Sequence, residues 1–237
     1  AMASPMSAEM REHFMITHFF NPVRYMALLE LVTGEHTLPA VVKAVASFGN
    51  QVLGKGIVFG KDTPNFVANR IGTYGMASAL RAMTDANLNI ETIDAIFGSA
   101  LGRPKSAVFR TGDLVGIDTL LHVFSNVYDN ATTDEERDLF LPPDWVKELV
   151  ANGALGSKSG AGFFKKDKID GKKVILSYDV ANKTYTPTEK PRYKSIGAAK
   201  RQDDPAAAIN AMLSGDDEAA KVAWRVIADT AIYAANR

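Results

Sequence analysis

The 237-residue sequence contains no cysteine, which excludes disulfide bonds, thiol catalysis and thiolate metal sites. It has no apolar run long enough to cross a bilayer, and it has no C-x-x-C motif, H-E-x-x-H motif or carboxylate cage for a metal. Basic and acidic residues each number 27, so no overall charge favours nucleic-acid binding. Because 46% of the residues are hydrophobic, the chain can bury a core. We expect a cytoplasmic protein without a membrane span or a metal.

One histidine lies where a general base could form. His18 precedes Phe19, Phe20, Asn21 and Pro22, and Glu30 follows in the next apolar run. Histidine titrates at about pH 6.5, and a carboxylate on its far ring nitrogen orients the ring and raises its basicity. The alternative interpretation is a histidine that is only packed at the rim of the core. Pro22 and Asn21 end the first run in a turn, which leaves His18 near the tip.

The apolar pattern predicts strands first and helices afterwards. Residues 14–20, 26–32 and 56–59 resemble strands, and residues 38–53 have helical spacing. Thr63 before Pro64 predicts the start of a helix, which would place Asn69 in its second turn. Further helices are predicted after Asn89, from about Thr111 and over residues 144–151. The helix from Thr111 should bury Leu114, Ile117, Leu121 and Phe124 on one face.

Four segments together resemble the 3-hydroxyacyl-CoA dehydrogenase family. They are THFFNPVRYMALLELV, GKDTPNFVANRIG, GRPKSAVFRTGDLVGID and GSKSGAGFF, and they occur in the order and at the spacing of that family across residues 16–164. The third segment is closer to the long bacterial enzymes that join this dehydrogenase to an enoyl-CoA hydratase. The resemblance therefore implies the middle fragment of a multifunctional enzyme of fatty-acid β-oxidation.

The resemblance also implies roles for individual residues. His18 matches the catalytic base, Glu30 its carboxylate partner, and Asn69 the asparagine that hydrogen-bonds the reacting oxygen. Asn21 matches a second, substrate-binding asparagine. The implied reaction oxidises an L-3-hydroxyacyl-CoA to the 3-ketoacyl-CoA while NAD becomes NADH. Asn65 stands where the family usually has glycine, which leaves the local loop geometry open.

Several features of the family are missing from the sequence. A dinucleotide site needs a strand, a G-x-G-x-x-G turn and an acidic residue about 20 positions later, and none is present. We therefore expect the cofactor-binding residues, and the NAD-binding domain that holds them, upstream of residue 1. The fragment alone should neither bind NAD nor act as an enzyme.

The implied fold class is mixed α/β and all-α. It comprises the C-terminal remnant of a Rossmann-type domain, a helical domain like the C-terminal domain of 6-phosphogluconate dehydrogenase, a small β-hairpin segment and a terminal helix. The expected divisions are a cloning remnant at 1–10, the end of the NAD-binding domain at 11–62, a helical substrate and dimerisation domain at 63–165, a hairpin and linker at 166–205, and the start of a second helical repeat at 206–237.

The lysine-rich segment after residue 164 has two interpretations. Residues 165–168, 172–177 and 183–186 could form a small antiparallel sheet with a turn at Asp170 and Gly171. Its lysines could protect a solvated edge or contact acidic groups of coenzyme A. The glycines of residues 153–164 superficially resemble a phosphate cradle, although a structural turn fits the family better.

Two functions from different classes remain. The first is an acyl-CoA dehydrogenation half that works with the NAD-binding domain and a linked enoyl-CoA hydratase domain. The second is a non-catalytic helical docking or dimerisation module, as in Rossmann dehydrogenases of the 3-hydroxyisobutyrate type. Incomplete sheet edges and an unpartnered terminal helix also predict self-association.

Overall fold

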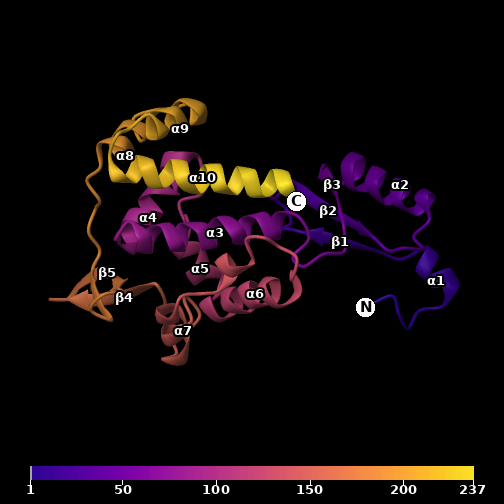
Figure 1. The fold of residues 1–237 in the computed structure, drawn as a ribbon, viewed down its shortest axis with the longest axis horizontal. Coiled ribbons are helices and arrows are strands. Elements are labelled where there is room, and N and C mark those ends of the chain that lie inside the picture. The colour runs from indigo at the N-terminus through magenta and orange to yellow at the C-terminus, as the bar shows by residue number, and fades with distance from the viewer. Residues whose placement is uncertain (1) are drawn as a thin grey trace. The chain divides into compact units, whose positions relative to one another are not determined.

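The computed structural model describes residues 2–237, which form two compact units with their boundary between Arg70 and Ile71 (Figure 1). The boundary therefore lies eight residues later than the expected start of the helical domain. Within the expected cloning remnant, residue 1 lies outside the described residues. Helix α1 (Ala8–Glu12) begins inside that segment, and the Ser7 hydroxyl caps it by accepting a hydrogen bond from the Met10 N–H.

The first unit contains a three-stranded sheet made of the predicted strands. Strand β1 (Met15–Phe19) pairs antiparallel with β2 (Leu28–Thr33), and β2 pairs parallel with β3 (Gly56–Gly60). Helix α2 (Pro39–Ser47) and a π-helical turn (Phe48–Val52) connect β2 to β3. This helical connection is the crossover that the parallel pair β2 and β3 needs between its strands.

The two faces of this sheet have different roles. Gly49 in the π-helical turn lies so close to Leu29 and Ile57 that an added Cβ would contact both side chains. The turn therefore covers the face that carries these two residues. Successive side chains of a strand point to opposite faces, so Glu30 lies on the other face of β2, opposite His18 in the register.

The helix after β3 begins later than its sequence predicts. Helix α3 (Ala68–Asp85) follows a turn in which Asn65 has φ 62° and Phe66 has φ 51°. These left-handed conformations cannot continue a right-handed helix, so the predicted start at Thr63 and Pro64 is wrong. Asn69 consequently lies in the first turn of α3 and not in the second.

The second unit is mainly helical. After α3 come α4 (Ile90–Ile96), a 3-10 turn (Ser99–Leu101), α5 (Phe109–Val115), α6 (Ile117–Asn130), a second 3-10 turn (Arg137–Phe140) and α7 (Asp144–Ala151). The predicted helix after Asn89 is confirmed, since the Asn89 side chain caps α4 by accepting the Thr92 N–H. The prediction over residues 144–151 is confirmed as α7.

The single helix predicted from Thr111 is wrong, because Gly116 divides it into α5 and α6. Gly116 has φ 101°, which a residue with a side chain rarely adopts. Ile117 and Phe124 are buried as expected, but Leu114 is 69% exposed. Leu114 therefore belongs to the surface of α5 and not to the core.

The lysine-rich segment forms the predicted small sheet. Strands β4 (Phe164–Ile169), β5 (Lys172–Asp179) and β6 (Thr184–Pro187) pair antiparallel in that order. Asp170 and Gly171 both have positive φ in the turn between β4 and β5, as a two-residue hairpin requires.

The C-terminal helices belong to the same core as the earlier helices. Helix α8 (Lys194–Ala199) lies inside the expected linker, and α9 (Pro205–Leu213) and α10 (Glu218–Asn236) follow it. Tyr233 of α10 stacks on Tyr74 of α3 with ring centroids 3.9 Å apart, and Arg225 bonds Asp85. Helices α3 and α10 therefore run antiparallel, side by side (Figure 1). Residues 206–237 pack within this unit, and their assignment as the start of a second helical repeat stays a prediction.

Within the described part of the chain, every helix is too short or too polar to span a membrane.

Candidate active site

The structure brings His18 and Glu30 into direct contact on the sheet of the first unit. The two residues are opposite each other in the β1–β2 register. His18 Nδ1 lies 2.6 Å from Glu30 Oε2, while the His18 side chain is 28% exposed and that of Glu30 is fully buried. An ionised carboxylate can only accept a hydrogen bond, so Nδ1 carries the proton. Neutral His18 is therefore left with an unprotonated Nε2 that can accept a proton.

The second oxygen of Glu30 holds the start of α3. Glu30 Oε1 accepts hydrogen bonds from the backbone N–H of Val67 at 3.1 Å and of Ala68 at 2.7 Å. The first N–H groups of a helix have no partners within it, and a carboxylate there also interacts favourably with the helix dipole. Glu30 thus joins the base to the helix that carries Asn69, and its own orientation is determined from both sides.

Two aromatic rings flank His18. The Phe20 ring centroid lies 4.7 Å from that of His18, and the Phe66 centroid lies 5.6 Å away. Both rings are tilted against the imidazole and limit its rotation. Sequence reasoning missed the role of Phe66, although this residue lies within the GKDTPNFVANRIG motif that placed Asn69.

The remaining predicted site residues lie close by in the same unit. Asn21 is exposed in the turn that follows β1, and Asn69 is exposed as the second residue of α3. Asn69 directly follows Ala68, whose N–H binds Glu30. The roles of Asn21 and Asn69 toward substrate stay predictions. The departure at Asn65 has a clear geometry, because its φ of 62° is one that glycine and asparagine adopt most readily.

The buried Lys55 holds the loop that follows His18. Its ammonium group donates hydrogen bonds to the carbonyl oxygens of Val23 and Met26, both at 2.6 Å. A charged donor bonded to two carbonyls stabilises more than a neutral donor does.

Among residues 2–237, no group of three or more His, Asp or Glu side chains is arranged to hold a metal.

The glycine-rich segment after α7 acts as a structural turn. Asp113 accepts hydrogen bonds from the N–H groups of Phe163 and Phe164, and its carbonyl accepts one from Ser157. An added Cβ at Gly156 or Gly162 would overlap Asp113. These glycines are needed for close approach to α5, which agrees with the structural interpretation of this segment.

Comparison with known proteins also divides the chain into two parts, with a boundary a few residues earlier than that between the two compact units. Residues 1–63 match the family model "3-hydroxyacyl-CoA dehydrogenase, NAD binding domain", and residues 66–166 match "3-hydroxyacyl-CoA dehydrogenase, C-terminal domain". The first match includes residues 1–10, which the sequence had suggested were a cloning remnant. The fold therefore combines part of a Rossmann-like, NAD-binding class of domain with a helical domain.

Individual relatives agree with this class. The chain is 42% identical over 234 residues to a probable 3-hydroxyacyl-CoA dehydrogenase of Bacillus subtilis, across 99% of this chain and 29% of that protein. It is 32% identical over 181 residues to a putative fatty acid oxidation complex trifunctional enzyme of Rickettsia prowazekii, across 76% of this chain and 25% of that protein. The crystal structure of (S)-3-hydroxybutyryl-CoA dehydrogenase from Ralstonia eutropha is 34% identical, with a TM-score of 0.56 over 63% of this chain and 50% of that one.

The chain belongs to the 3-hydroxyacyl-CoA dehydrogenase family. It spans between a quarter and a half of the length of these three relatives.

Proposed function

We propose that this chain contributes the general base of an L-3-hydroxyacyl-CoA dehydrogenase of fatty-acid oxidation. One observation carries the proposal, namely the contact between His18 Nδ1 and the buried carboxylate of Glu30. It leaves Nε2 of His18 available to take the proton from the C3 hydroxyl of the substrate. The resulting imidazolium is stabilised by Glu30, which cannot turn away because Val67 and Ala68 bind its other oxygen.

Asn69 is proposed to donate a hydrogen bond to the substrate oxygen as the hydroxyl becomes a carbonyl. A donor aimed at an oxygen where charge develops lowers the barrier without reorganising during the reaction. Asn21 is proposed to bind substrate from the turn after β1. Both residues are exposed, as groups that contact a ligand need to be.

NAD is proposed as the hydride acceptor of the whole protein, because the matched model of residues 1–63 describes an NAD-binding domain. A dinucleotide site requires a strand, a glycine-rich turn and a helix in succession. The residues described here do not form this motif, since α2 follows β2 without a G-x-G-x-x-G turn. We therefore assign only the proton transfer to this chain and no step to the cofactor.

The finer details of architecture and context are also proposals. We infer that residues 66–166 have a fold like the C-terminal domain of 6-phosphogluconate dehydrogenase. The similarity to a protein named a trifunctional enzyme of fatty acid oxidation supports a linked enoyl-CoA hydratase domain in the whole protein. The substrate is accordingly proposed to be an acyl-CoA.

The test is His18→Gln in the whole protein, with NADH formation from an L-3-hydroxyacyl-CoA as the readout. Loss of the base should lower kcat by at least about two orders of magnitude. His122→Gln provides a matched control, because His122 is exposed on α6 in the second unit and should leave kcat unchanged. If His18→Gln keeps most of its turnover while the fold is intact, the assigned base is wrong and the docking-module alternative gains support.

A further inference from the structure

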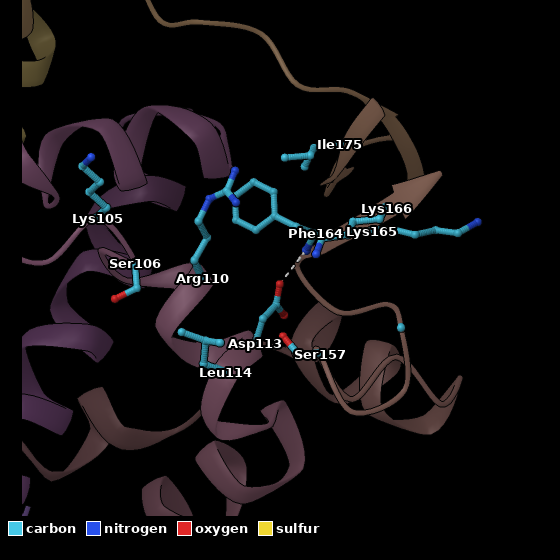
Figure 2. A pocket seen from close by; sticks show the side chains of 11 residues that line it. Lys105, Ser106, Arg110, Asp113, Leu114, Ser157, Phe164, Lys165, Lys166 and Ile175 are labelled. Carbon is cyan, nitrogen blue, oxygen red and sulfur yellow. Dashed lines mark hydrogen bonds between the residues drawn. The ribbon is translucent and has the colours of Figure 1, made fainter. Parts of the chain in front are cut away.

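A basic cavity of about 530 Å³ lies in the second unit (Figure 2). Lys105 and Ser106 come from the loop before α5, Arg110 from α5, and Phe164, Lys166 and Ile175 from the small sheet. The volume falls within the range of small-molecule pockets, which is about 300–1,000 Å³. Segments that are distant in the sequence therefore converge on one hollow.

The cavity has more positive than negative charge. Its lining includes Lys105, Arg110, Lys165 and Lys166 but only one carboxylate, that of Asp113. Both oxygens of Asp113 already accept backbone N–H groups, from Phe163 at 2.8 Å and Phe164 at 2.9 Å. Asp113 is thus engaged in holding the turn to α5, and its charge offsets only part of the positive charge of the lining.

Three of the cations make no close ion pair. Lys165 pairs with Asp167 at 2.9 Å. Across the described range 2–237, Lys105, Arg110 and Lys166 make no ion pair within 4.0 Å. Arg110 interacts with Asp94 and Asp113 beyond ion-pair distance, so the positive charge around the hollow is only partly neutralised and the cations repel one another. An anion bound in the cavity would relieve that repulsion.

Arg110 is held ready for such an anion. Its guanidinium carbon lies 4.5 Å from the centroid of the Phe164 ring, and Figure 2 shows the two groups next to each other. A cation–π contact of this kind leaves guanidinium N–H groups able to bind a planar or tetrahedral oxyanion. The Ser106 hydroxyl lies 3.0 Å from the Thr111 hydroxyl, whose single proton is donated to the Ala107 carbonyl oxygen at 2.7 Å.

Apolar side chains lie beside these cations. Phe164 and Lys166 are two residues apart in β4 and share a face of the sheet with Ile175, which pairs with Lys166. Leu114 is 69% exposed and Ile175 is 37% exposed at the cavity. A simple inorganic anion would leave this apolar surface in water, whereas a larger ligand with an apolar or ring-shaped body would cover it.

We propose that this cavity binds a small molecule that carries two or more phosphate groups on an apolar or ring-containing body. Phosphates supply several acceptor oxygens and more than one negative charge, which match three separate cations better than a single carboxylate does. Either the phosphorylated end of coenzyme A or a separate nucleotide has this chemistry. The site lies wholly within the second unit and does not depend on the proposed role of His18.

The test is calorimetric titration of the 237-residue chain with pyrophosphate, adenosine diphosphate, coenzyme A and phosphate-free pantetheine. Pyrophosphate should bind saturably at low salt and more weakly as salt is added. Arg110→Gln and Lys166→Gln should each weaken binding about tenfold or more, because each removes a charge-assisted contact. Lys200→Gln is the matched control, since it removes one positive charge from an exposed position outside the cavity lining.

The outcomes separate the two sources and can refute the site. Tighter binding of coenzyme A than of adenosine diphosphate identifies a coenzyme A derivative as the ligand, whereas equal or weaker binding identifies a nucleotide. The proposal is overturned if pyrophosphate does not bind, if pantetheine binds as well as coenzyme A, or if both cavity variants bind like the Lys200→Gln control. Lys166→Gln changes a strand residue without a described ion pair, so it keeps the test valid should Arg110→Gln misfold.

Discussion

Replacing Glu30 with glutamine should switch the position of the proton on the His18 ring. Glutamine has one oxygen and one NH₂ group where glutamate has two oxygens. One end of the side chain faces His18 Nδ1 at 2.6 Å, and the other faces the N–H groups of Val67 and Ala68. The amide oxygen can therefore face either His18 or the two backbone N–H groups, but not both.

The amide oxygen should face the two backbone N–H groups. An NH₂ group turned toward Val67 and Ala68 would leave two buried N–H donors without an acceptor, at a cost of about 1–3 kcal/mol each. Turning the NH₂ group toward His18 instead costs little, because a neutral imidazole can accept a hydrogen bond at Nδ1 once its proton moves to Nε2. Glu30→Gln should therefore hold His18 as the Nε2–H tautomer, which has no free nitrogen to act as base.

Nitrogen-15 NMR of the histidine rings, at a pH where they are neutral, measures this switch directly in the 237-residue chain. In the parent protein His18 should have its proton on Nδ1, and in Glu30→Gln on Nε2. His13 is an internal control, because its Nδ1 lies 2.9 Å from the carbonyl oxygen of Glu9 and should keep its proton in both proteins. In the whole enzyme the same change should lower kcat by orders of magnitude, since a base in the wrong tautomer loses about 10⁴ in the best-studied triad.

The variant should also lower the free energy of unfolding by about 1–3 kcal/mol, because two hydrogen bonds to a charged group become bonds to a neutral one. Urea denaturation would measure this loss. An unchanged tautomer of His18 in Glu30→Gln would refute the inferred arrangement, since the ring would then not be oriented by Glu30.

Four further predictions concern other parts of the chain. Asn65→Ala should be less stable than Asn65→Gly by about 1–2 kcal/mol in urea denaturation, because both variants lose the side chain but only alanine is strained at φ 62°; equal stabilities would contradict the left-handed turn. Burial raises the pKa of Asp94 from 3.8 to about 6 despite its three backbone N–H donors. The folded state therefore favours the protonated carboxyl, and the free energy of unfolding should fall by about 3 kcal/mol as pH rises from 3.8 to about 6. Asp94→Asn should lack this part of the pH dependence, and a pH profile identical to that of the parent protein would show that the pKa is not raised. The chain should show no saturable NAD binding by calorimetry, and binding at micromolar concentration would refute this. It should also self-associate through the exposed Phe48, Val52 and Phe59 of its first unit, and a monomer in light scattering would refute that expectation.

Local sequence patterns determined the elements whose cause is local. The alternation and β-branched residues of the first strands, the Asn89 cap of α4, the amphipathic spacing of α7 and the Asp170-Gly171 turn were all readable from neighbouring residues. The pairing of His18 with Glu30 was also predictable, although through resemblance to a family. In each case the interacting groups lie close in the chain or belong to a known motif.

Tertiary structure decided the features whose cause lies far along the chain. Helix α3 begins at Ala68 and not at Pro64, because Glu30, nearly forty residues earlier, accepts the N–H groups there. Helix α10 packs on α3 because Tyr233 stacks on Tyr74, which lies far earlier in the chain, and α9 joins the core of the second unit through the buried Met212. The basic cavity forms because the turn held by Asp113 brings the small sheet beside Arg110. A sequence pattern indicates which groups must be buried or hydrogen-bonded, but the packing of distant segments determines which residues contact them.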